Sequence, residues 1–145
     1  MSADLPRGGG DAAAGSPRTM PAMATLLVAD DLVPIRQMVR ITLSTQGWTI
    51  LEAKNGAEAL DLARSSKPDL ILLDVDMGPG PNGFDVCKTL KSEPGTKDIP
   101  VVMLTAHESD TDRAIGFAAG ATQYLTKPFG PLELIDTIRG ILAHS

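Results

Sequence analysis

The chain has 145 residues, of which 43% are hydrophobic and only 3% aromatic, so we expect one domain with an aliphatic core. A net charge of −5 argues against nucleic-acid binding by this chain, and no apolar run is long enough to span a membrane. A single cysteine, Cys87, excludes an internal disulfide and fits a reducing cytoplasm, where we expect a soluble protein.

Residues 1–22 differ in composition from the rest of the chain. They are mostly glycine, alanine, proline and serine with scattered charges. Such a segment has too little apolar surface to bury, so it is predicted to be a disordered leader. The ordered pattern begins at Met23, which gives a single predicted domain over 23–145.

Five apolar runs follow in chain order, each typical of a strand. They lie at 25–29, 49–53, 70–75, 100–104 and 122–126. Three of them are nearly continuous in apolar residues, as expected for strands that are covered on both faces. The sequence therefore predicts a sheet that is buried between two layers.

Stretches of helical periodicity separate these runs. The first is opened by Pro34 and ended by Gly47, and the last is opened by Pro131. The intervening helices are expected over 57–66, over 84–92 and around Ala114, Phe117 and Ala118 before Gly120. Five β/α pairs with short connections predict a parallel α/β sheet, with functional groups beyond the carboxyl ends of its strands.

Acidic residues follow two of the predicted strands. Asp30 and Asp31 come after the first, and Asp74 ends the third with Asp76 two residues further on. Each could be a helix cap or a turn residue when taken alone. Together at one edge of the sheet they would repel one another unless a cation lay among them. Oxygen ligands with room for water and phosphate favour Mg²⁺.

The other two strand ends in this region carry groups that suit a phosphoryl ligand. Thr105 follows the fourth strand and offers a hydroxyl, and Lys127 follows the fifth and offers an ammonium. Singly, these could be a turn residue and a solvated charge. With Asp74 as a carboxylate nucleophile, they predict an aspartyl-phosphate switch.

Four segments, in this order, carry a family resemblance. They are "LLVADD", "LILLDVDM" with "NGFDVCKTLK", "IPVVMLTA" and "YLTKPF". From about residue 24 to 144 the chain resembles the receiver domains of two-component response regulators, such as the chemotaxis regulator. The resemblance implies a flavodoxin-like (βα)5 three-layer fold with strand order 2-1-3-4-5. It also implies a sensor histidine kinase or a histidine phosphotransfer protein as the phosphoryl donor.

The resemblance further implies a role for each acid. Asp74 is the implied phosphoacceptor, and Asp31 and Asp74 are implied to bind Mg²⁺ directly, together with the backbone carbonyl of Asp76. Asp30 is implied to act through water. Self-catalysed phosphorylation and dephosphorylation would then be the only chemistry, without turnover of a separate substrate.

The remaining family positions concern the switch. Thr105 and Lys127 match the family's hydroxyl and lysine, Lys127-Pro128 matches its cis peptide, and Tyr124 matches its switch aromatic. Asp76 and His107 occupy the two variable positions that influence the lifetime of the phosphoryl group. His107 is equally compatible with a solvent-facing loop residue.

One segment departs from the family pattern. Gly78 stands where the family has proline after the residue matching Met77, so "GPGPNG" makes the loop before Gly83 about one residue longer. Asp76 keeps its place two residues after Asp74. Glycine and proline at these positions would let the chain turn away from the path of the phosphoryl group.

The signal is expected to leave through residues 108–140, the face around the fourth helix and the fifth strand and helix. Attraction of Thr105 to the phosphoryl group would vacate space for Tyr124, which biases an existing equilibrium. Ala114, Ala118 and Ala119 could be core residues or a flat docking patch, and two of the three are expected in the core. The partner would be a downstream protein or an output domain.

Two other functions fit part of the pattern. "LLDVDMG" resembles the nucleophile motif of haloacid-dehalogenase phosphatases, which also use Asp, Mg²⁺, Thr or Ser, and Lys. That family places its nucleophile on the first strand and has a threonine after the motif, neither of which holds for this chain. The second alternative is a binding module that never accepts phosphate, which the full set of pocket residues argues against.

Overall fold

The computed structural model describes residues 24–106 and 110–143. Five parallel strands form one sheet in the order β2-β1-β3-β4-β5. The strands are β1 (Thr25–Ala29), β2 (Thr49–Ala53), β3 (Leu70–Asp74), β4 (Val101–Thr105) and β5 (Gln123–Thr126). The predicted strand order is confirmed, and the predicted strand ends all lie within one residue of the observed ones.

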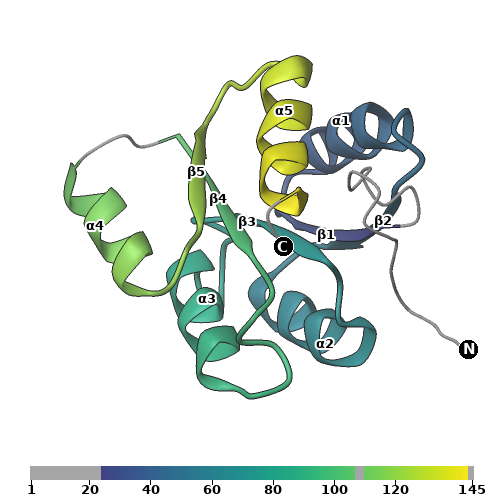
Figure 1. The fold of residues 1–145 in the computed structure, drawn as a ribbon. Coiled ribbons are helices and arrows are strands. Elements are labelled where there is room, and N and C mark those ends of the chain that lie inside the picture. Colours follow the sequence, from purple (N-terminus) through teal and green to yellow (C-terminus); the bar gives the residue numbers. More distant parts are fainter. Residues whose placement is uncertain (1–23, 107–109, 144–145) are drawn as a thin grey trace, which may run out of the picture.

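Helices alternate with the strands along the chain (Figure 1). They are α1 (Val33–Ser44), α2 (Gly56–Ser66), α3 (Gly83–Ser92), α4 (Asp110–Ala118) and α5 (Pro131–Leu142). Proline lies in the first turn of α1 and of α5, where its missing N–H is not needed by the helix. Asn55 and Asn82 cap α2 and α3 with their side chains. None of these helices, within the part of the chain described, has the length and apolarity needed to cross a membrane.

The sheet separates two aliphatic cores. Strand residues alternate between its faces, so in β1 Leu26 and Val28 pack with α1 and α5, while Leu27 and Ala29 pack with α2 and α3. Figure 1 shows α1 and α5 together on one side of the sheet and α2 and α3 on the other. Burial on both faces explains the near-continuous apolar runs of β1, β3 and β4.

Strand register brings the carboxyl ends of four strands to one edge. Ala29 pairs with Leu73, Asp74 pairs with Leu104, and Thr105 pairs with Thr126. The residues that follow β1 and β5 therefore lie level with the ends of β3 and β4. This alignment brings side chains from several strand ends together at one edge. The predicted leader, 1–22, and His107 lie outside the described residues.

Candidate functional site

Three aspartates gather at the carboxyl edge of the sheet. Asp30 and Asp31 follow β1 and Asp74 ends β3, and each offers a carboxylate oxygen within 4.8 Å of the others. Asp30 and Asp74 are buried, with exposed fractions of 0% and 4%, whereas Asp31 is exposed. The pocket is therefore lined by two buried carboxylates and is open to solvent at Asp31.

Lys127 is the cationic partner of this pocket. Its Nζ lies 2.9 Å from Oδ2 of Asp30 and 3.1 Å from Oδ1 of Asp74. Partial burial would lower the pKa of Lys127, but its hydrogen bonds and attraction to the two acids outweigh burial and raise it. Lys127 therefore stays protonated and offsets part of the negative charge of the pocket.

The carboxyl of Asp74 is strongly perturbed. Burial, with the negative charges of Asp30 and Asp31, raises its pKa from 3.8 to about 6 against the opposing effect of Lys127. Lys127 is thus not sufficient to offset burial and the two neighbouring acids at Asp74. The donor set consists of carboxylate oxygens and is partly open to water, which suits a small hard cation such as Mg²⁺.

Local hydrogen bonds shape the start of the pocket. Oδ1 of Asp30 accepts a hydrogen bond of 3.0 Å from the backbone N–H of Leu32, which turns the chain from β1 into α1. The Asp30 carboxylate thus binds Lys127 with one oxygen and this turn with the other. The Asp30 carboxylate is therefore fixed by one residue that follows β1 and one that follows β5.

Thr105 and Asp76 lie at and after the ends of β4 and β3, respectively. Thr105 is buried at the end of β4, and its carbonyl accepts a hydrogen bond of 2.7 Å from the backbone N–H of Lys127. The peptide between Lys127 and Pro128 is cis, as the resemblance implied. Asp76 is exposed in the loop after β3. The structure thus brings Asp30, Asp31, Asp74 and Lys127 together, with Thr105 at the end of the neighbouring strand, while Asp76 is not in the acidic group.

The loop after β3 turns back at two glycines. Gly78 and Gly80 have φ of +78° and +95°, a region that favours glycine. A β-carbon on Gly78 would lie 3.8 Å from Oδ2 of Asp31, so this loop borders the acidic pocket. Pro81 lies against Gly56 at the start of α2, and Asn82 then caps α3. The longer loop is therefore accommodated by packing against α2.

Tyr124, the predicted switch residue, is buried at 9% exposure. Its ring lies 5.2 Å from that of Phe117, centroid to centroid, and the guanidinium carbon of Arg113 lies 5.7 Å from its centroid. Its hydroxyl occupies the space where a β-carbon of residue 116 would be. Gly116 thus permits the inward position of Tyr124.

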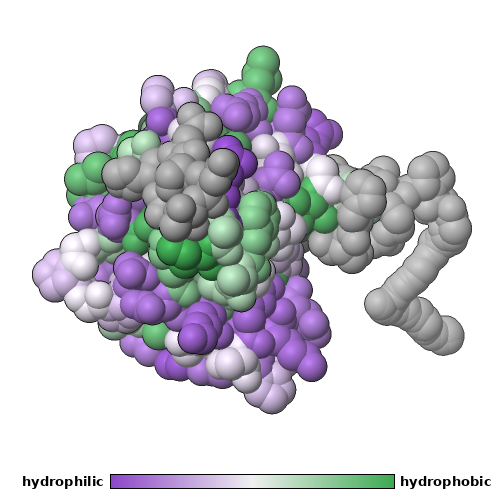
Figure 2. Space-filling view, turned by 90° about the vertical axis from the view of Figure 1, so that its left-hand side faces the viewer, coloured by the Kyte–Doolittle hydropathy of each residue, from purple (hydrophilic) through white to green (hydrophobic). Residues whose placement is uncertain are grey.

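The prediction that two of the three alanines of α4 lie in the core is wrong. Ala114 and Ala118 are exposed, and only Ala119, just after the helix, packs partly against the core. The buried residue of the helix between them is Gly116, because Tyr124 fills the space beneath it. Ile115 and Phe117 remain 45% and 50% exposed. Figure 2, which views the molecule from the α4 side, shows a hydrophobic patch on this face.

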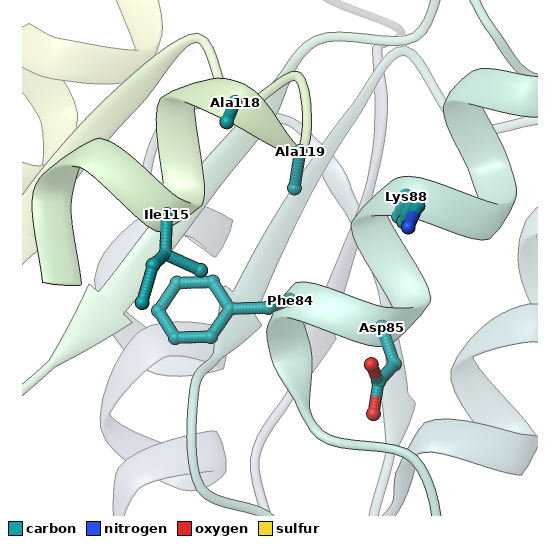
Figure 3. A pocket seen from close by; sticks show the side chains of 6 residues that line it. All are labelled: Phe84, Asp85, Lys88, Ile115, Ala118 and Ala119. Carbon is teal, nitrogen blue, oxygen red and sulfur yellow. The ribbon is translucent and has the colours of Figure 1, made fainter.

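A groove of about 340 Å³ lies between α3 and α4. Phe84 of α3 points toward Ile115 of α4, and Asp85 and Lys88 lie on its α3 side (Figure 3). The groove is lined mainly by apolar atoms, and its α4 side belongs to the face 108–140 where the signal is expected to leave. It holds none of the acidic pocket residues.

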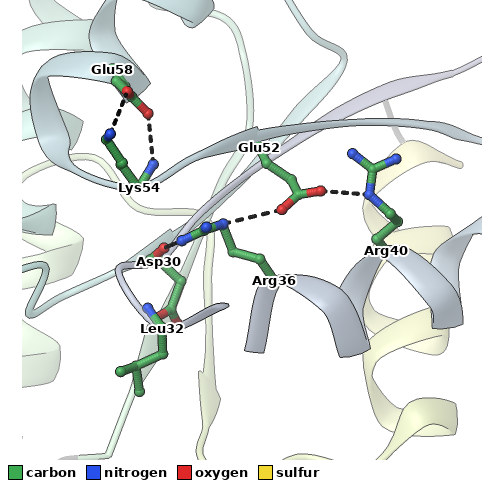
Figure 4. A network of polar contacts seen from close by, with 7 residues as sticks. All are labelled: Asp30, Leu32, Arg36, Arg40, Glu52, Lys54 and Glu58. Carbon is green, nitrogen blue, oxygen red and sulfur yellow. Dashed lines mark hydrogen bonds and ion pairs between the residues drawn. The ribbon is translucent and has the colours of Figure 1, made fainter. Parts of the chain in front are cut away.

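Sequence reasoning missed a polar network beside the pocket. Arg36 of α1 donates hydrogen bonds to the carbonyl of Asp30 and to Glu52 of β2, and Arg40 also binds Glu52 (Figure 4). The available signals were a lone acid inside an otherwise apolar strand and two arginines one helical turn apart. Neither signal indicates on its own that Arg36 reaches Asp30.

The strand order of the sheet defines a flavodoxin-like α/β domain, and the three aspartates form an acidic pocket at the carboxyl edge of this sheet. Residues 26–139 match the response regulator receiver domain. The chain belongs to this family, and the haloacid-dehalogenase alternative finds no support.

Its relatives are two-component response regulators. The chain is 42% identical over 121 residues to the phosphate regulon transcriptional regulatory protein PhoB of Pseudomonas aeruginosa, covering 83% of this chain and 52% of PhoB. It is 40% identical over 120 residues to the DNA-binding response regulator MtrA of Mycolicibacterium paratuberculosis, covering 83% and 52%. The chain spans about half the length of these curated relatives.

Solved structures support the same family. The chemotaxis protein CheY4 of Vibrio cholerae, crystallised at pH 4.0, superposes with a TM-score of 0.78 at 38% identity. The match covers 82% of this chain and 98% of CheY4. The flavodoxin-like fold and the receiver-domain function are therefore confirmed.

Proposed function

We propose that Asp74 accepts a phosphoryl group from the phosphohistidine of a sensor histidine kinase or a histidine phosphotransfer protein, or from a small phosphodonor. The observation that carries this proposal is the pocket itself. A buried carboxylate lies 3.1 Å from the ammonium of Lys127 and beside two further acids. Such a group is a nucleophile with a cation already positioned for incoming phosphoryl oxygens.

The cation in this proposal is Mg²⁺. Asp31, Asp74 and the backbone carbonyl of Asp76 would hold it directly, and Asp30 would act through water. When bound, the ion neutralises charge that would otherwise repel a phosphoryl donor from the carboxylates. The support for it is the all-oxygen donor set, together with the raised pKa of Asp74, to which burial contributes most and the negative charges of Asp30 and Asp31 contribute further.

The chain's own residues then perform the transfer. A carboxylate oxygen of Asp74 attacks phosphorus, the bond from phosphorus to the donor's nitrogen breaks, and the imidazole leaves with the electron pair. No general base is needed, because a carboxyl with a pKa of about 6 is mostly ionised above pH 7. Lys127 pairs with the phosphoryl oxygens and Thr105 donates a hydrogen bond to them. Attack by water later releases phosphate, so the protein turns over no separate substrate.

The output surface in this proposal is the described part of 108–140. Movement of Thr105 toward the phosphoryl group changes the space available to Tyr124. Tyr124 contacts Phe117, which is half-exposed, so a change in its position alters the α4 surface. A downstream protein or an output domain would bind there. The proposal places this signalling in the cytoplasm, without membrane or nucleic-acid binding by this chain.

Labelling by acetyl phosphate tests the proposal. Wild-type protein with Mg²⁺ is expected to gain one phosphoryl group by intact mass, while Asp74→Asn and metal-free wild type gain none. Asp61→Asn is the matched control, because Asp61 is an exposed acid on α2 and should label like wild type. Equal labelling of Asp74→Asn would contradict the proposal, and absence of any labelling would favour a binding module.

A further inference from the structure

Arg36 connects three elements beside the acidic pocket. It lies in the first half of α1, and its side chain is only 14% exposed. Its Nη1 donates a hydrogen bond of 2.7 Å to the backbone carbonyl of Asp30, and its Nε donates one of 3.1 Å to Oε1 of Glu52. The planar guanidinium thus binds a main-chain oxygen and a carboxylate at the same time.

Glu52 is fixed from a second side. Its Oε2 lies 2.5 Å from Nε of Arg40, one helical turn further along α1. Burial would raise the pKa of Glu52, but the hydrogen bonds from Arg40 and Arg36 outweigh it and hold the pKa below its usual value. Glu52 is therefore ionised at neutral pH, and it orients Arg36 toward Asp30 as Figure 4 shows.

The carbonyl that Arg36 binds belongs to the peptide between Asp30 and Asp31. On its strand side, the N–H of Asp30 donates a hydrogen bond of 3.1 Å to the carbonyl of Ala53. Asp31 comes after that hydrogen bond and is exposed. The contact from Arg36 thus restrains the main chain directly before the Asp31 carboxylate.

The restraint on this peptide opposes the electrostatic repulsion between the neighbouring carboxylates. Repulsion among three carboxylates favours their separation, and only Lys127 opposes it among the cations described at the pocket. A loop that is held in place before a cation binds loses less conformational entropy when it binds. Residues that orient metal ligands typically contribute about 10–100-fold to metal affinity.

We propose that Arg36, braced by Glu52, is a positioning residue that holds the peptide between Asp30 and Asp31 so that both carboxylates face Asp74 and a divalent cation. This inference rests on the proposed function only in that the acidic pocket takes Mg²⁺. It assigns to the α1–β2 network a role in cation binding, beyond joining two elements of the fold.

Calorimetric titration with Mg²⁺ alone, in the absence of phosphodonor, tests this role. Arg36→Ala is expected to weaken Mg²⁺ binding by roughly 10-fold or more. Arg36→Lys keeps the charge but lacks the planar guanidinium that binds the Asp30 carbonyl and Glu52 at once. A smaller loss of Mg²⁺ affinity than in Arg36→Ala is therefore expected. Glu52→Gln removes the charge that orients Arg36 and should also give a partial loss.

Arg40→Ala is the matched control. Arg40 is half-exposed and binds the same glutamate, Glu52. Within the described part of the chain, the Arg40 side chain makes no hydrogen bond to Asp30. Its Mg²⁺ affinity should stay within about twofold of wild type, since an exposed ion pair contributes little. Thermal unfolding of every variant in EDTA separates loss of fold from loss of cation binding.

A second readout uses acetyl phosphate labelling at increasing Mg²⁺. Arg36→Ala should need more Mg²⁺ for half-maximal labelling but reach the wild-type rate at saturation, because Arg36 itself touches neither Asp74 nor the phosphoryl group. Unchanged Mg²⁺ affinity in Arg36→Ala, or an equal loss in Arg40→Ala, would overturn the inference. If Arg36→Ala does not fold, wild-type affinity in both Arg36→Lys and Glu52→Gln would overturn it.

The two proposals fail separately. Normal Mg²⁺ binding without any labelling would contradict the phosphoacceptor role of Asp74 and leave the role of Arg36 intact. Labelling with no effect of Arg36 on Mg²⁺ would do the reverse.

Discussion

Asp74 combines burial with negative neighbours, and its pKa of about 6 makes the stability of the fold depend on pH. The folded state binds the Asp74 proton more tightly than the unfolded chain, whose pKa is near 3.8. As pH rises through this window, the unfolded state loses its proton first, so the free energy of unfolding falls. Without a cation, an ionised Asp74 therefore destabilises the protein at neutral pH.

Asp74→Asn is expected to stabilise the metal-free protein. At about pH 8 in EDTA, the free energy of unfolding should rise by roughly 1–3 kcal/mol, because a pKa shift of one unit corresponds to about 1.4 kcal/mol. Near pH 4 most of this gain should vanish, since Asp74 is then protonated in the folded protein. Urea unfolding at both pH values measures the difference.

Asp61→Asn again serves as control for this prediction. Asp61 is exposed on α2, so its replacement should give no gain that depends on pH in this way. A destabilised Asp74→Asn at pH 8 would show that Lys127 fully compensates the pocket, which would contradict a raised pKa of Asp74.

At the scale of elements, Tyr124 of β5 packs against α4 through Arg113, Gly116 and Phe117. The hydroxyl of Tyr124 lies where a β-carbon of residue 116 would be, so Gly116→Ala should displace Tyr124 from its buried position. Tyr124 is the only tyrosine in the sequence, so a fluorotyrosine label gives one ¹⁹F resonance. We expect Gly116→Ala to shift this resonance toward that of exposed tyrosine and to increase its solvent accessibility.

Ala118→Ser is the control on the same helix. Ala118 is exposed, and its replacement should leave the Tyr124 resonance unchanged. A buried Tyr124 in Gly116→Ala would mean that α4 moves as a whole instead. The same label tests the prediction that Tyr124 changes environment on phosphorylation, for which identical spectra with and without a phosphoryl mimic would count against a switch.

Most of the fold could be predicted from the sequence because strand and helix periods are strong where burial is complete. The apolar runs of β1, β3 and β4 are covered on both faces, and each is found within one residue of its prediction. The face of α4 was not predictable in this way. Its apolar residues have helical spacing, but the side that meets the sheet is decided by Tyr124 filling the space at Gly116.

The pocket could be predicted because its residues share one simple property, namely their place at the ends of parallel strands. The strand order alone is enough to predict that Asp30, Asp74 and Lys127 lie close together. The strand order is not enough to predict the contact of Arg36, because its side chain reaches from α1 back to the carbonyl of Asp30. Sequence spacing alone carries no information on that contact.

On the scale of the whole molecule, the acidic pocket couples ligand binding to the stability of the domain. The pocket residues follow or end β1, β3 and β5, and the first two are interior strands of the sheet. A ligand that binds only the assembled pocket stabilises the entire fold by mass action, by about 2.7 kcal/mol at roughly 100 times its dissociation constant. Thermal unfolding therefore reports on the pocket without any knowledge of the partner protein.

The central claim is that a divalent cation allows these crowded carboxylates to accept another anion. Thermal unfolding with Mg²⁺ and beryllofluoride, added singly and together, tests it most directly. We predict that beryllofluoride raises the melting temperature by several degrees only when Mg²⁺ is present, and not in Asp74→Asn. An equal rise in EDTA, or no rise with both present, would contradict the claim.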